Sequence, residues 1–197
     1  MINEEKVKNL ITEILKEIGE NENRPGLLDT PKRVARMYNE IFRGYDEKQI
    51  PKVTTFMNGE DGLCYKGMVI DEGDFYSHCE HHMVPFFGRY YFAYIPHPEG
   101  KILGLSKVAR VVDYYSAKLQ IQERLVQEIV DYLWKELCKG VEHEPLGMAL
   151  FMRGKHLCKC MRGAKKDGWM VSNYVKGAFK DNQSTKEEFL KFVKLND

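Results

Sequence analysis

The chain has 197 residues, of which 43% are hydrophobic, and its 30 Lys and Arg residues nearly balance its 29 Asp and Glu residues, for a formal net charge of +1. This length suits one domain with a buried core, with or without an appendage. A nearly neutral chain is not held to nucleic acid by bulk charge, so we expect no nucleic-acid partner. The sequence has no run of about 18 uncharged apolar residues, so we also expect no membrane-spanning segment.

Five cysteines are too few, and odd in number, for a disulfide framework in a chain of this size. The first ten residues, MINEEKVKNL, are charged and lack the apolar centre of a signal peptide. We therefore expect a cytoplasmic protein whose cysteines serve as thiols or metal ligands.

Two helices are predicted near the start of the chain. Apolar residues from Val7 to Ile18 recur at three- and four-residue spacing, and Gly19 ends this helix. Thr30 is predicted as the N-cap of a second helix that ends at Gly44. We therefore divide the chain into a helical N-terminal region, residues 1–48, and a catalytic domain, residues 49–197.

Short strands are predicted from about residue 52, in the segments KVTTFM, GMVID, DFYSHC and RYYFAYI, which are rich in β-branched and aromatic residues. Helices are predicted over 108–119 and 125–137. Strands return in LGMALFMR, HLCKCM and WMVSNYVK, and a last helix is predicted from Ser184, with Glu187 completing a capping box. This order predicts an α+β fold with helices on one face of an antiparallel sheet.

Most of the potential metal ligands lie in two segments, SHCEHH at residues 77–82 and HLCKC at residues 156–160. Cys79 and His82 have a Cys-x-x-His spacing, with which one turn can present a thiolate and an imidazole to the same ion. On a β-strand, His156, Cys158 and Cys160 would share one face. Because zinc binds both kinds of ligand, we predict a shared zinc site.

The number of ligands separates a structural zinc site from a catalytic one. Cys79, His82, Cys158 and Cys160 together would close a structural site, whereas three ligands would leave a position for an activated water. The spacing leaves both open. His81 lies next to the predicted ligands, as His156 does, and histidine can act as an acid or a base near neutral pH. These additional histidines favour catalysis.

Basic residues gather at the starts of two predicted helices, where free N–H groups favour anions. Lys107 and Arg110 share one helix face, Arg33 and Arg36 share another, and Arg162 follows the second cysteine segment. A single pair of this kind is typical of a solvated helix. Together they favour a polyanionic small substrate such as a nucleoside triphosphate, although the chain has no Walker A loop.

Gln122 and Glu123 can offer a hydrogen-bonding edge and a carboxylate to a guanine base, although an exposed polar helix start is the more common explanation for such a pair taken alone. Zinc deaminases of nucleobases are a competing class. Their H-x-E and P-C-x-x-C signature is missing from the sequence.

Between about Ile14 and Phe192 the chain resembles the GTP cyclohydrolase I family. Four blocks carry the resemblance, in this order: ENENRPGLLDTPKRVARMYNEIFRGY, CEHHMVPFFGRYYFAYIP, GLSKVARVVDYYSAKLQIQERL and HLCKCMRG. The second and third blocks are highly specific to this family.

The resemblance implies a tunnelling fold, in which an antiparallel sheet carries two helices on one face after a helical N-terminal part. It further implies a homodecamer of two stacked five-membered rings with active sites between subunits. Cys79, His82 and Cys158 would bind Zn²⁺ and leave the fourth position for water, so that Cys160 would not be a ligand.

The reaction that the resemblance implies is hydrolytic opening of the imidazole ring of GTP, with release of formate and rearrangement to 7,8-dihydroneopterin triphosphate. His81 would protonate the leaving nitrogen, and His156 and Ser106 would assist opening of the ribose. Gln122 and Glu123 would recognise the guanine edge. The triphosphate would be held by Lys107, Arg110, Arg162, Arg33 and Arg36, the last two from a neighbouring subunit.

The resemblance is weaker in one segment, from Ala164 to Lys176, which is poor in hydroxyl side chains where the family usually has a Ser- and Thr-rich strand. Two alternatives therefore stay open. One is an enzyme of the same fold that acts on another purine or pterin. The other is a non-catalytic module stabilised by zinc.

Overall fold

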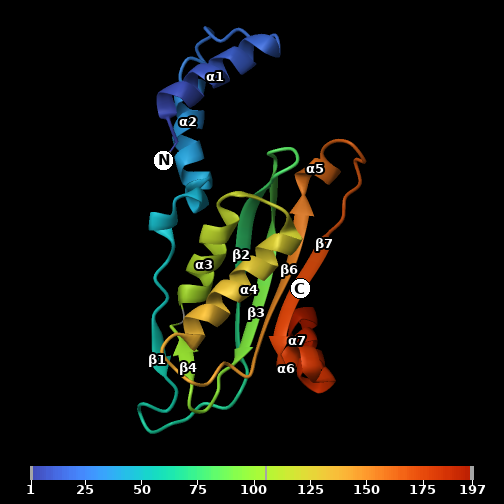
Figure 1. Ribbon diagram of the computed structural model, residues 1–197. Coiled ribbons are helices and arrows are strands. Elements are labelled where there is room, and N and C mark those ends of the chain that lie inside the picture. Colours follow the sequence, from blue (N-terminus) through green and yellow to red (C-terminus); the bar gives the residue numbers. More distant parts are fainter. Residues whose placement is uncertain (1, 105, 196–197) are drawn as a thin grey trace.

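A five-stranded sheet organises the molecule, with its strands in the order β5–β2–β3–β6–β7 (Figure 1). The computed structural model describes residues 2–104 and 106–195. The long strands are antiparallel to their neighbours and comprise β2 (Val69–Cys79), β3 (Pro85–Ile95), β6 (Gly147–His156) and β7 (Met170–Gly177). The short β5 (Leu119–Gln120) runs parallel to the end of β2. The protein is therefore α+β, but its sheet is mixed and not wholly antiparallel as predicted.

Two helices, α3 (Ser106–Ser116) and α4 (Gln122–Cys138), cover one face of this sheet (Figure 1). Leu125, Ile129 and Leu133 recur along one side of α4 and are fully buried against the sheet. Burial of each such side chain contributes about 2 kcal/mol. The helix predicted to reach Leu119 ends at Ser116, because Leu119 belongs to β5.

Part of the opposite face is covered by α6 (Ala178–Asp181) and α7 (Gln183–Leu195). Phe179 and Phe189 pack there against Tyr91 and Ala149, whose side chains point away from α3 and α4 because neighbours along a strand alternate between faces. The sequence predicted α7 within one residue of its start, but it did not predict α6.

Four predicted strands differ in the structure. GMVID and DFYSHC form the single strand β2, and KVTTFM contributes only β1 (Thr55–Met57), which pairs with β4 (Lys101–Leu103). The prediction of a strand in HLCKCM is wrong, because β6 ends at His156 and the helical turn α5 (Leu157–Cys160) follows. In register, the residue after His156 would face Pro85, which has no N–H to continue the ladder.

The N-terminal helices α1 (Glu4–Glu17) and α2 (Thr30–Ile41) form a pair that extends beyond one end of the sheet (Figure 1). The short turns η1 (Arg43–Tyr45) and η2 (Glu47–Gln49) connect this pair to the rest of the molecule. Thr30 is the first helical residue of α2, and the N-cap position belongs to Asp29. None of the helices in the two described ranges is long and apolar enough to cross a membrane.

Gly44 joins the helical pair to the body by a close backbone approach. Its N–H donates to the carbonyl oxygen of Ala117 at 2.8 Å. A Cβ at this position would lie 2.4 Å from the carbonyl oxygen of Tyr114 and 2.7 Å from that of Ala117.

We therefore expect Gly44→Ala to destabilise the protein by about 1–3 kcal/mol, because neither carbonyl can yield without moving α3. Urea unfolding followed by circular dichroism, at matched protein concentration, measures this loss. Gly26→Ala is the matched control, since its Cβ would meet only the flexible end of Arg24 and should change stability by less than about 0.5 kcal/mol. Equal unfolding midpoints for the two variants would contradict the expectation.

Candidate active site

Cys79, His82 and Cys158 converge at one end of the sheet, and their ligand atoms lie within 4.8 Å of one another. Cys79 is the last residue of β2, His82 lies in the turn between β2 and β3, and Cys158 lies in α5. Segments almost 80 positions apart in the sequence thus meet, because β2 and β6 both pair with β3.

The turn that carries His82 is held tightly. The N–H of Met83 donates to the carbonyl oxygen of Cys79 at 2.8 Å, and the N–H of Cys79 donates to the carbonyl oxygen of Val84 at 2.9 Å. Met83 has a φ of +55°, a left-handed conformation that is costly for a residue with a side chain. An ion pair between Arg124 and Glu80 ties the turn to the start of α4.

The donor set fits a divalent metal ion. Burial, reinforced by the neighbouring Cys79 thiol, raises the pKa of the Cys158 thiol above its usual range, while the Arg162 guanidinium partly opposes this shift. Two thiols forced together in this way are stabilised as thiolates when a cation lies between them. Two sulfurs and one imidazole match the ligand preferences of zinc.

Cys160 does not belong to the converging group. Its sulfur lies 3.9 Å from Oδ1 of Asp167. The sequence grouped it with His156 and Cys158 on one strand face, but α5 is helical, and residues two apart on a helix point in different directions.

His156 lies beside the metal ligands in a fixed orientation. Its ring stacks on the buried ring of Phe86, with a centroid distance of 4.4 Å and an interplanar angle of 7°. Its Nε2 lies 3.0 Å from Oε1 of Gln122. Burial lowers the pKa of His156, an effect that the Glu123 carboxylate opposes and the Lys159 ammonium reinforces. This shift favours the neutral ring at neutral pH.

Gln122 fixes which ring nitrogen of His156 carries the proton. Its Nε2 lies 3.1 Å from the carbonyl oxygen of Met152, 3.2 Å from that of Met170 and 2.9 Å from Oγ of Ser172. Two carbonyl acceptors require the NH₂ group on that side, so Oε1 faces His156 and accepts its Nε2–H. The neutral ring is left with an unprotonated Nδ1.

Gln122 lies inside the protein in this chain. The residue is 0% exposed and its amide is engaged by the protein, so it does not face an open site. Glu123, the next residue, is exposed and close enough to His156 to influence its pKa. Ser172 and Phe86, which support this arrangement, were missed by the sequence analysis, and a hydroxyl or an aromatic ring in a strand gave no signal of this role.

His81 is exposed beside the metal ligands, with Nδ1 3.6 Å from Sγ of Cys79. Arg162 is also exposed and close enough to Cys158 to oppose the rise in the pKa of that thiol. The chain itself therefore brings together the three ligands, His81, His156, Glu123 and Arg162.

The structure does not bring Ser106 and Lys107 to this cluster. They line a hollow beside the middle of β2, and Cys79 is five residues beyond the last lining residue of that strand, Asp74, which is about 17 Å along an extended chain. The exposed Arg110 lies one helical turn further along α3. The same hollow is lined by four carboxylates, Asp71, Glu72, Asp74 and Asp113. These would repel a polyphosphate bound there.

Arg33 and Arg36 are exposed on α2, in the helical pair that extends beyond the sheet (Figure 1). Arg33 contacts its own helix start, with Nη2 3.1 Å from Oγ1 of Thr30 and 3.3 Å from the carbonyl oxygen of Gly26. Arg33 and Arg36, two of the residues predicted to bind anions, thus lie on the N-terminal helical pair and not on the sheet.

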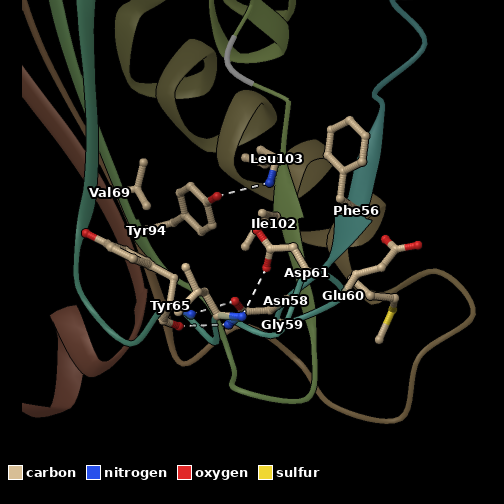
Figure 2. A pocket seen from close by; sticks show the side chains of 12 residues that line it. Phe56, Asn58, Gly59, Glu60, Asp61, Tyr65, Val69, Tyr94, Ile102 and Leu103 are labelled. Atoms are coloured by element: carbon tan, nitrogen blue, oxygen red, sulfur yellow. Dashed lines mark hydrogen bonds between the residues drawn. The ribbon is translucent and has the colours of Figure 1, made fainter.

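An apolar pocket of about 630 Å³ lies elsewhere, between the β1–β4 pair and the main sheet (Figure 2). Figure 2 shows Tyr94 pointing into it, with its hydroxyl oxygen accepting the N–H of Leu103 at 3.0 Å. None of the site residues predicted from the sequence lines this pocket.

An α+β domain in which two cysteines and a histidine converge beside two further histidines defines a candidate metal-dependent enzyme. The sequence model of the family described as GTP cyclohydrolase I matches residues 7–194 of this chain. The chain belongs to the GTP cyclohydrolase I family.

Curated relatives are similar over nearly their full length. GTP cyclohydrolase 1 of Caldanaerobacter subterraneus is 42% identical over 196 residues, which cover 98% of each chain. GTP cyclohydrolase 1 of Bacillus subtilis is 39% identical and covers 100% of this chain and 98% of its own length. A crystal structure of the archaeosine synthase QueF-Like in the apo form shares 14% identity over 55% of this chain, with a TM-score of 0.40, a likeness too weak to assign a fold.

We expect Cys158→Ser to lose bound zinc and Cys160→Ser to retain it, because only Cys158 lies among the converging ligand atoms. Metal content per chain, measured by mass spectrometry after dialysis against zinc and then buffer, compares the two variants. Equal loss from both would instead indicate a closed four-ligand site and favour a non-catalytic zinc-stabilised module.

Proposed function

We propose that this protein is a GTP cyclohydrolase, which opens the imidazole ring of GTP by hydrolysis, releases formate and forms 7,8-dihydroneopterin triphosphate, the first step of tetrahydrofolate and pterin synthesis. The observation that carries the proposal is the convergence of Cys79, His82 and Cys158 beside His81 and His156, in a chain of the GTP cyclohydrolase I family.

Cys79, His82 and Cys158 would hold Zn²⁺ in this proposal. Bound there, the ion supplies a Lewis acid that activates water for hydrolysis. Three protein ligands suit such a role, since a fourth would close the site. The tight β2–β3 turn keeps His82 close to Cys79, which reduces the rearrangement that metal binding requires.

His81 and His156 would divide the proton transfers. His81 is exposed beside the metal ligands and would protonate the nitrogen that leaves when the imidazole ring opens. His156 is neutral, with its Nε2–H held by Gln122, so its Nδ1 is free to accept a proton during opening of the ribose. Ser106, the other residue proposed for this step, would come from a neighbouring chain.

Recognition of the substrate would fall to residues of opposite charge. The Glu123 carboxylate would accept hydrogen bonds from the guanine edge, while Gln122 acts only through His156. Arg162 would meet the triphosphate from the same chain. Four further cations would reach the triphosphate from neighbouring chains: Lys107 and Arg110 on α3, and Arg33 and Arg36 on the N-terminal helical pair.

We propose a tunnelling fold assembled as a homodecamer of two five-membered rings, with active sites between subunits. The support within this chain is the separation of Lys107 from the metal ligands and the carboxylates that surround it. A site that needs both Lys107 and the metal ligands is incomplete in one chain. A heterologous contact between copies can complete it.

The zinc-loaded protein should convert GTP to formate and, after oxidation, to fluorescent neopterin. His81→Ala should lower kcat by about a hundredfold or more while metal content stays unchanged, because the residue donates a proton and is not a ligand. A zinc-loaded sample that yields neither product would refute the activity. A faster reaction with another purine nucleotide or a pterin, in direct competition with GTP, would favour the alternative substrate.

Mixing two inactive variants tests whether the site is shared between chains. Lys107→Ala and His81→Ala should each be inactive alone. Chains co-expressed in equal amounts should recover about a quarter of wild-type activity, the fraction of interfaces that pair two intact halves. If Lys107 and His81 serve the same site from one chain, no mixed assembly regains activity, and the shared site is excluded.

A further inference from the structure

A second group of metal-binding side chains lies at the far end of the sheet from Cys79. His97 and Glu99 belong to the turn between β3 and β4, and His143 to the loop between α4 and β6 (Figure 1). β3 starts beside the candidate active site and spans about 33 Å before it reaches this turn. The group is therefore independent of the site described above.

The three side chains already meet. Nε2 of His143 lies 3.0 Å from Oε2 of Glu99, and one ligand atom from each of the three residues lies within 4.8 Å of the other two. The rings of His97 and His143 are stacked, with centroids 4.3 Å apart and an interplanar angle of 13°. Ligand atoms around one tetrahedral ion are about 3.3 Å apart, so binding needs a contraction of the group and a reorientation of the stacked rings.

The β3–β4 turn is closed by a backbone hydrogen bond and packs against the loop that carries His143. The N–H of Gly100 donates to the carbonyl oxygen of His97 at 3.0 Å, with Pro98 suited to the second position of that turn. A Cβ on Gly100 would lie 3.0 Å from Cβ of His97 and 3.4 Å from the carbonyl oxygen of His143. The close approach at Gly100 therefore sets the distance between the histidine-bearing loops.

The turn is also anchored to the neighbouring pocket. Asn58, one of the residues drawn in Figure 2, donates from Nδ2 to the carbonyl oxygens of His97 at 3.1 Å and of Tyr65 at 2.7 Å. Its Oδ1 accepts the N–H of Tyr65 at 2.8 Å. Because Asn58 is itself buried, these bonds restrict the position of the His97 backbone.

We propose that His97, Glu99 and His143 form a second metal site, for a divalent transition ion such as Zn²⁺, Co²⁺ or Ni²⁺. Two imidazoles and one carboxylate are the ligands that such ions share, and they leave positions for water. A metal binds in the plane of an imidazole, so one of the stacked rings turns about its Cβ–Cγ bond. This torsion is soft, and both side chains are partly exposed.

The surroundings favour a cation. His143 lies between Glu142 and Glu144, both exposed on the same loop, and Glu99 adds a third carboxylate from the turn. The nearby ammonium of Lys101 is engaged by the carbonyl oxygen of Lys139. A bound ion would cross-link the two loops and stabilise the folded protein, since it binds the native arrangement only.

Cobalt(II) titration of the full-length Cys158→Ser variant tests the proposal. We expect one equivalent per chain to bind without the sulfur-to-cobalt charge-transfer bands that a thiolate site produces, and to raise Tm. Adding His143→Ala should abolish both signals, and Glu99→Gln should weaken binding about tenfold or more. Glu142→Gln, on the same loop but outside the group, is the matched control and should change neither signal.

A second titration uses wild-type protein loaded with one equivalent of zinc per chain. Its result does not depend on whether the Cys158→Ser variant folds correctly. Thiolate-free cobalt binding that disappears with His143→Ala would support the second site. The proposal is overturned if this zinc-loaded protein takes up no further cobalt, or if wild type and His143→Ala take up the same amount. Loss of activity alone plays no part in the test, so failure of the cyclohydrolase proposal would leave it unaffected.

Discussion

The register of β3 against its two neighbours determines where the three metal ligands and His156 lie. Pro85 faces His78 on β2, and Phe86 faces His156 on β6. Cys79 and Cys158 therefore both leave the sheet just beyond the start of β3, which brings their sulfurs together. Because side chains alternate along a strand, a slip of one residue would turn Phe86 away from His156 and separate the ligands.

The junction of α4 with β6 and β7 adds a second constraint. Gln122 is the first residue of α4, yet its amide is bound to the backbone of both strands and to His156. The first residue of α4 thus supplies the oxygen that accepts the Nε2–H of His156. Burial lowers the pKa of His156, and the contact with Gln122 fixes its tautomer.

The sequence predicted the components of the site better than their arrangement. The Cys-x-x-His spacing correctly identified Cys79 and His82 as neighbours. Apolar periodicity located α1 and α4, and the capping-box pattern located α7. The helical form of α5 could not be predicted locally, since it depends on Pro85 of another strand. The burial of Gln122 depends likewise on β6 and β7, and the carboxylates around Lys107 come from β2 and α3. Each of these features depends on a contact between segments distant in the chain.

Gln122 illustrates how folding and chemistry become inseparable at one position. A carboxylate there would face two carbonyl oxygens, and an apolar side chain would leave those oxygens, Ser172 and the His156 ring without their partner. A replacement at Gln122 therefore changes both the packing of α4 on the sheet and the ring nitrogen of His156 that carries the proton. The protein has few routes to vary this residue, so selection for a stable fold alone would preserve part of the machinery for proton transfer.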